Sequence, residues 1–155
     1  MRATYGSKLR AMRAEIQAAE GRPFSIEKEL TALLNEGGPH LAEDPLLSLS
    51  DEAHSGAMYA LVHAAESLDQ SPYRLHVSTV TSILPQMFEK APDWSLQVLR
   101  RLMGAEATLG ELTRQLPEAA APIKETALRI CMLNDAVTPD YMPANVKTQV
   151  ARAAS

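Results

Sequence analysis

The sequence predicts an all-α protein. Alanine, leucine, glutamate and arginine are plentiful, whereas isoleucine, phenylalanine and tryptophan are scarce, and this composition favours helix over sheet. Apolar residues recur every three or four positions along most of the chain, as one face of a helix requires. Prolines and glycines divide this pattern into seven or eight helical segments with short connections, and no segment indicates a convincing strand.

The predicted architecture is a single helical domain over residues 1–155, with its helices stacked as antiparallel hairpins in a HEAT/armadillo-like manner. A chain of 155 residues fits one domain and hides roughly two thirds of the surface of its unfolded form. Because no self-similarity at a fixed period is clear, an irregular helical bundle is the alternative.

The first two predicted helices occupy the N-terminal part of the chain. Apolar residues from Leu9 to Ala19 predict a helix that stops near Gly21, and Ser25 can cap a second helix that ends at Gly37. Residues 37–50 are predicted to form a loop, because two prolines and two glycines interrupt any period. Such a long loop is often functional in a compact domain.

A third helix is predicted to follow this loop and to stop near Asp69. Ser50 and Asp51 offer its N-cap, and Glu52 in the first turn suits the helix dipole. The predicted core positions of this helix are Met58, Leu61, Val62 and Ala65.

The fourth and fifth predicted helices both begin at prolines. Ser71 and Pro72 predict the start of the fourth helix, with proline at its first helical position, and Pro85 is expected to kink or split that helix. Pro92 opens the fifth helix, which ends at Gly104. Trp94, the only tryptophan, falls on the apolar face of this helix and is therefore predicted to lie in the core.

Three weaker helical patterns complete the chain. A short helix is centred on Leu109, Leu112 and Leu116. A stripe from Ile123, extended to Leu133, ends at Asn134, a residue that suits a helix C-terminus, and a last helix is predicted over residues 144–153.

Histidine chemistry is the first candidate for a metal or catalytic site. His63 and Glu66 form an H-x-x-E pair on one helical face, which could supply two ligands to one ion. No second copy of this pair exists, whereas di-iron bundles need several inward carboxylates. The other histidines, His40, His54 and His76, add no motif. We therefore expect no metal, although a metal-binding bundle that uses His63 and Glu66 is a distant alternative.

The remaining motifs do not indicate an enzyme. Cys131 is the only cysteine and lies on an apolar stripe without a basic neighbour, so it is expected to be a buried, inert thiol. No nucleophile elbow, phosphate-binding loop, dinucleotide fingerprint or zinc-protease motif occurs. We expect no catalytic residue and no cofactor. A single cysteine suits a reducing compartment, and no signal peptide or membrane span is evident, so the protein is expected to be cytoplasmic.

Charge is distributed unevenly along the chain. Residues 23–73 carry nine acidic side chains and one basic side chain, whereas the segments on either side are net positive. Such a concentrated negative field repels nucleic acid and attracts basic proteins. Only Lys28 offsets the nine carboxylates, which are Glu27, Glu29, Glu36, Glu43, Asp44, Asp51, Glu52, Glu66 and Asp69. A solvated helical face is the plain interpretation, but clustering around the long loop favours a docking surface for a basic partner.

Residues 61–104 combine several local features. Glu66-Ser67 follows an apolar helix, Leu84-Pro85 interrupts the next helix, Lys90-Ala91-Pro92 precedes Trp94, and Arg101 stands before a helix end. In this combination the stretch resembles the core of the Immunity protein 30 family of bacterial polymorphic toxin systems. This chain has Gly104 where the family commonly has asparagine.

The resemblance implies an all-α protein that binds the C-terminal domain of a cognate toxin and blocks it inside the producing cell or its siblings. Contact-dependent growth inhibition is one such setting. The predicted mechanism is stoichiometric occlusion, in which the acidic surface covers a cationic site, expected to belong to a nuclease, or a neighbouring exosite. A general helical adaptor that inhibits nothing is the competing class. The sequence does not specify an oligomeric state.

Overall fold

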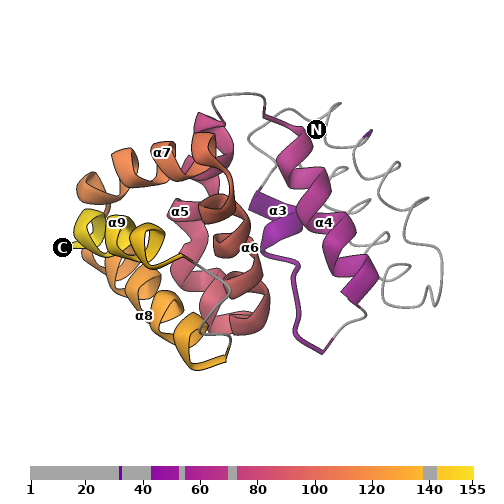
Figure 1. The fold of residues 1–155 in the computed structure, drawn as a ribbon. Coiled ribbons are helices and arrows are strands. Elements are labelled where there is room, and N and C mark those ends of the chain that lie inside the picture. Colours follow the sequence, from indigo (N-terminus) through magenta and orange to yellow (C-terminus); the bar gives the residue numbers. More distant parts are fainter. Residues whose placement is uncertain (1–31, 33–42, 53–54, 70–72, 138–142) are drawn as a thin grey trace. The chain divides into compact units, whose positions relative to one another are not determined.

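The computed structural model describes residues 43–52, 55–69, 73–137 and 143–155, together with Ala32. Helices and turns account for these residues, and no strand occurs among them (Figure 1). The all-α prediction is therefore confirmed, whereas the predicted helices that end at Gly21 and Gly37 lie outside the described residues. Within the described ranges, no helix is both long and apolar enough to cross a membrane.

The chain forms two compact units, Met1–Asp69 and Gln70–Ser155. In the first unit, α3 (Glu43–Leu46) packs against α4 (Ser55–Ser67). The second unit comprises α5 (Arg74–Lys90), α6 (Pro92–Gly104), α7 (Glu106–Gln115), the 3-10 turn η2 (Leu116–Glu118), α8 (Ala121–Val137) and α9 (Ala144–Ala154). The stacking of hairpins, the number of helices and the single-domain organisation stay predictions.

The stretch predicted as a loop contains a helical turn, α3, which corrects that prediction. Its acidic and proline residues suit a first helical turn, and Leu46 and Leu49 anchor it because both side chains are completely buried. The backbone N–H of Ser50 then donates to the Met58 sulfur at 3.3 Å, which ties the end of this stretch to α4.

The N-terminus predicted for α4, the helix that follows α3, is wrong. The helix α4 begins at Ser55, so neither Ser50 nor Asp51 caps it, and Glu52 is not in its first turn. The Ser50 hydroxyl instead accepts a hydrogen bond from the backbone N–H of Glu52 at 3.4 Å, which is a local turn that competes with helix capping. The predicted core of α4 is confirmed, because Met58, Leu61, Val62 and Ala65 are all buried.

The start of α5 also differs from the prediction. The helix begins at Arg74, because Tyr73 adopts a left-handed conformation with φ 60° and ψ 29°, so Pro72 is not at its first position. Pro85 lies inside α5 and does not split it. Proline removes one backbone hydrogen bond, but the buried side chains of Leu84 and Met87 hold the helix on both sides of it.

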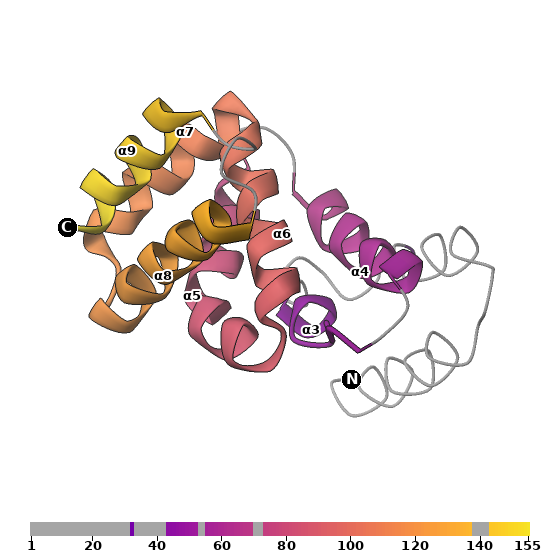
Figure 2. The same cartoon turned by 60° about the horizontal axis from the view of Figure 1, so that its bottom comes forward.

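The helix α6 follows the sequence prediction closely. It begins at Pro92 and ends at Gly104, and Trp94 is buried, with 8% of its surface exposed. The Ser95 hydroxyl donates to the carbonyl oxygen of Ala91 at 2.8 Å, which secures the first turn. In the second unit, α5 contacts α6, α7 and α8, and α9 contacts α7, α8 and η2 (Figures 1 and 2).

The interior of α8 contains the largest departure from the predicted elements. Asn134 does not end this helix but lies inside it, completely buried, and its Oδ1 accepts a hydrogen bond from Arg100 Nε at 2.6 Å. Leu133, which the stripe predicts to be in the core, is 40% exposed. A buried guanidinium needs a hydrogen-bond acceptor, and Asn134 supplies one to Arg100 from inside α8, although asparagine is more common at helix ends. The last predicted helix is confirmed as α9.

Candidate functional site

The predicted acidic surface lies within the first unit. Glu43 is exposed on α3, Asp51 and Glu52 are exposed in the turn after it, and Glu66 and Asp69 are half-buried at the end of α4. Asp44 belongs to α3. Three further predicted members, Glu27, Glu29 and Glu36, lie outside the described residues.

The described carboxylates gather at two places along α4. The turn that carries Asp51 and Glu52 is tied to Met58 by the Ser50 hydrogen bond. Glu66 is eight residues further along the helix, which corresponds to about 12 Å at 1.5 Å per residue.

No lysine or arginine occurs between residues 29 and 73 of the sequence. The stretch of sequence that includes the described carboxylates of the first unit therefore supplies no lysine or arginine of its own. A surface of one charge sign raises the association rate of an oppositely charged protein by long-range attraction. The docking of a basic protein on this segment stays a prediction.

Sequence reasoning missed an aromatic side chain on α4. Tyr59 is 40% exposed, and its ring lies 6.2 Å from the His63 ring at an angle of 43°. The spacing of these two residues, i and i+4 on the face opposite Met58 and Leu61, was the available signal. Exposed tyrosines are common among the residues that dominate protein interfaces.

The predicted pair of His63 and Glu66 does lie on one helix, with both side chains half-buried. In the described ranges, no group of three histidine, cysteine, aspartate or glutamate side chains is arranged to hold a metal ion. His76 and Cys131 are both buried in the second unit, and the predicted burial of Cys131 is confirmed. His40 and His54 lie outside the described residues.

Glu111 is the centre of a polar network in the second unit. Its carboxylate is 7% exposed and accepts two hydrogen bonds from Arg114, one of them from Nε at 3.0 Å. Gln115 Nε2 donates to the same carboxylate at 2.6 Å, and Arg74 Nε lies 3.9 Å from it. Hydrogen bonding from Arg114, and then from Gln115, lowers the pKa of Glu111 from its ordinary 4.5 to about 2. The same pairing raises the pKa of Arg114.

This network predicts a specific response to acid. Because the pKa of Glu111 is lower in the folded chain, the unfolded chain binds its proton more readily, so the stabilisation is complete above pH 4.5 and is lost as the pH falls towards 2. We expect Glu111→Gln to flatten the fall in melting temperature between pH 5 and pH 2, measured by circular dichroism. Glu125→Gln, which changes an exposed carboxylate, is the control. A wild-type profile in Glu111→Gln would contradict the assignment.

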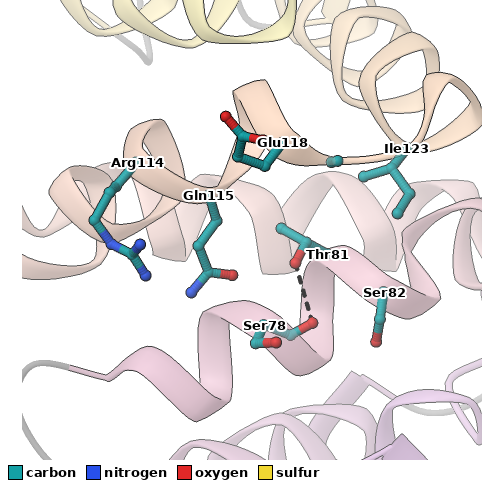
Figure 3. A pocket seen from close by; sticks show the side chains of 8 residues that line it. Ser78, Thr81, Ser82, Arg114, Gln115, Glu118 and Ile123 are labelled. Carbon is teal, nitrogen blue, oxygen red and sulfur yellow. Dashed lines mark hydrogen bonds between the residues drawn. The ribbon is translucent and has the colours of Figure 1, made fainter.

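A groove of about 310 Å³ lies beside this network. One wall comes from α5 and the other from the end of α7, η2 and the start of α8 (Figure 3). The residues that line it are Ser78, Thr81, Ser82, Arg114, Gln115, Glu118, Ala119 and Ile123. Sequence reasoning did not identify this groove, because its two walls are separated by some thirty residues of chain.

The described residues define an all-α protein that has a segment rich in carboxylates in its first unit and a small groove in its second unit. The Immunity protein 30 family model matches residues 10–112, which is more than half of the chain, and the chain belongs to this family. Membership of an immunity family implies a toxin-neutralising role with a protein toxin as partner. Comparison with curated proteins and with solved structures gives no match.

Proposed function

We propose that this protein binds the C-terminal domain of one cognate toxin and neutralises it by stoichiometric occlusion in the cytoplasm of the producing cell. The family match over residues 10–112 is the observation that carries this proposal. The toxin belongs to a polymorphic or contact-dependent growth inhibition system, and its toxic activity is that of a nuclease. The immunity protein makes and breaks no bond and needs no cofactor.

The acidic segment supports a cationic toxin as partner. A nuclease has to attract the phosphate backbone of its substrate, so its substrate site is surrounded by lysine and arginine. Carboxylates such as those of Glu43, Asp51 and Glu52 attract the same surface and compete with the nucleic acid for it. Occlusion of the substrate site, or of a neighbouring exosite, then follows from binding alone.

Charge by itself does not explain tight inhibition. Exposed charges at the rim of an interface mainly raise the association rate, whereas buried aromatic anchors supply most of the binding free energy. Tyr59 is placed for such a role, because it is exposed on the same short stretch of chain as the carboxylates. We therefore infer that the carboxylates raise the association rate and that Tyr59 supplies binding free energy.

Reversing charge in the acidic segment tests the electrostatic mechanism. In the quadruple variant, Glu43, Asp44, Asp51 and Glu52 are each replaced by lysine. We expect association with the inactivated toxin domain to slow by about tenfold or more at low salt, within the range that electrostatic steering contributes. Stopped-flow fluorescence at two salt concentrations measures this rate, and growth of cells that express the active toxin measures protection.

Two double variants with the same net charge show whether the position of the carboxylates or only the overall charge of the protein controls the association rate. The double variant Asp51→Lys with Glu52→Lys and the double variant Glu89→Lys with Glu125→Lys change the net charge equally, and all four side chains are exposed. Only the first pair should slow association strongly. Equal slowing by both pairs would show that the overall charge matters and the acidic segment does not.

A further inference from the structure

The helix α4 offers solvent one narrow line of side chains. Tyr59 is 40% exposed, and His63 and Glu66 are half-buried at the positions i+4 and i+7 from it, so the three lie on one face of the helix. The buried residues of α4 occupy the rest of its surface, and they are Ala57, Met58, Ala60, Leu61, Val62, Ala64 and Ala65. A partner that contacts α4 therefore contacts the line from Tyr59 to Glu66.

The ring of Tyr59 is the largest feature of this line. Tyr59 is the one aromatic residue among the large apolar side chains that are exposed in the described part of the chain. Its ring centroid lies 6.2 Å from that of His63, at an interplanar angle of 43°, which is within the range of favourable aromatic pairs. The imidazole thus supports the phenol ring on one side, and a partner meets a flat π surface rather than a flexible aliphatic chain.

The charges of the first unit select the kind of group that this ring receives. In the described residues 43–52 and 55–69, every aspartate and glutamate is accompanied by no lysine or arginine. A cationic group is attracted both by carboxylates and by the electron-rich face of an aromatic ring, whereas an anionic group is repelled by both. The combination of an exposed phenol ring with neighbouring carboxylates therefore fits a cationic side chain.

An arginine suits this place better than a lysine. A guanidinium is planar and weakly hydrated, so it can stack on an aromatic face while its N–H groups bond at the edge, whereas an ammonium is compact and strongly hydrated. The second unit contains an example of this geometry, because the guanidinium carbon of Arg129 lies 5.1 Å from the centroid of the Phe88 ring. A guanidinium on the Tyr59 ring should lie at a similar distance.

We propose that Tyr59 receives the guanidinium of one arginine of the toxin, stacked on the phenol ring beside His63. This inference rests on the proposed function, because it takes the toxin as the partner. It assigns the binding to the π face of the ring rather than to its apolar surface alone. His63 is then a positioning residue, which acts through Tyr59.

Fluorinated phenylalanines at position 59 of the full chain test this proposal. Each added fluorine withdraws electron density from the ring face and so weakens its attraction for a cation, while the apolar surface of the ring is kept. The probe is the toxin domain that co-purifies with this chain, in a catalytically inactivated form, and titration calorimetry gives its dissociation constant. We expect Tyr59→Phe to bind nearly like wild type, and the affinity to fall stepwise by about tenfold from phenylalanine to its trifluorinated form.

The matched control is the same series at Leu75, which is 39% exposed and belongs to the second unit. Fluorination at that position should leave the affinity unchanged, and the melting temperatures should match within each series. An affinity that is constant or rises with fluorination at position 59 would overturn the guanidinium contact and leave the proposed function standing. Failure of the wild-type chain to bind any toxin domain would overturn both.

Substitutions in the toxin identify the arginine. Each surface arginine of the toxin domain is changed to glutamine, and every variant is titrated against the wild-type chain and against the chain with trifluorinated phenylalanine at position 59. We expect one arginine whose loss weakens binding to the wild-type chain by about tenfold and weakens binding to the fluorinated chain much less. The absence of any such coupled arginine would contradict the proposal.

Discussion

Trp94→Ala is expected to lower the free energy of unfolding by about 3–5 kcal/mol, the usual cost of truncating a large buried aromatic side chain. Trp94 is 8% exposed in the first turn of α6, and Val98 and Leu99 on the same helix are also buried. Since small domains have about 5–15 kcal/mol of stability in total, this variant should lose a large part of its stability and melt well below the wild type.

Urea unfolding followed by circular dichroism measures this effect, because the variant lacks the only tryptophan and its fluorescence. Trp94→Phe is the control and should lose much less stability, since it retains most of the buried surface. Toxin binding should fall only as far as the folded population falls. A Trp94→Ala variant that melts like wild type but does not bind toxin would show that the indole contacts the partner instead.

Asn134→Leu is expected to cost about 1.5–3 kcal/mol, because it removes the acceptor of a hydrogen bond from a buried charged group. Arg100 is 7% exposed and Asn134 is completely buried, and their 2.6 Å bond joins α6 to α8. In addition, Asn134 Nδ2 has no hydrogen-bond partner among the described residues. The side chain is therefore kept for its oxygen, which leucine cannot replace although its volume is similar.

A double-mutant cycle isolates this pair. Arg100→Met with Asn134→Leu removes the charge and its partner together, so the double variant should be more stable than the sum of the two single changes predicts. Chemical denaturation of the four proteins gives the coupling free energy. If the changes in the free energy of unfolding were strictly additive, the hydrogen bond between the two side chains would not stabilise the packing of α6 on α8.

The elements that depend on local signals could be predicted from the sequence. Pro92 and Gly104 mark the ends of α6 because proline fits a first helical turn and glycine favours a helix exit. The start of α5 could not be predicted, since nothing in the sequence shows that Tyr73 takes a left-handed conformation. The position of Asn134 inside α8 could not be predicted for a related reason, because its partner Arg100 is 34 residues away.

Of the candidate sites, the acidic segment could be predicted from the sequence, whereas the groove and the network around Glu111 could not. A run of carboxylates is a property of composition, so the acidic segment is evident from the amino-acid sequence alone, although its separation into two groups along α4 is not. The groove depends on bringing Ser82 next to Gln115, and only the packing of α5 on α7 does this. The role of Glu111 likewise requires the geometry that fixes Gln115 and Arg114 around it.

The central claim is that this chain neutralises one toxin by binding it. Affinity purification of the tagged full chain from its native host, at low and at moderate salt, tests this claim most directly. We predict that one toxin fragment co-elutes in a one-to-one complex, is retained at moderate salt, and is inactive until the complex is dissociated. A spread of unrelated partners, or a co-eluting toxin that remains active in the complex, would contradict the claim.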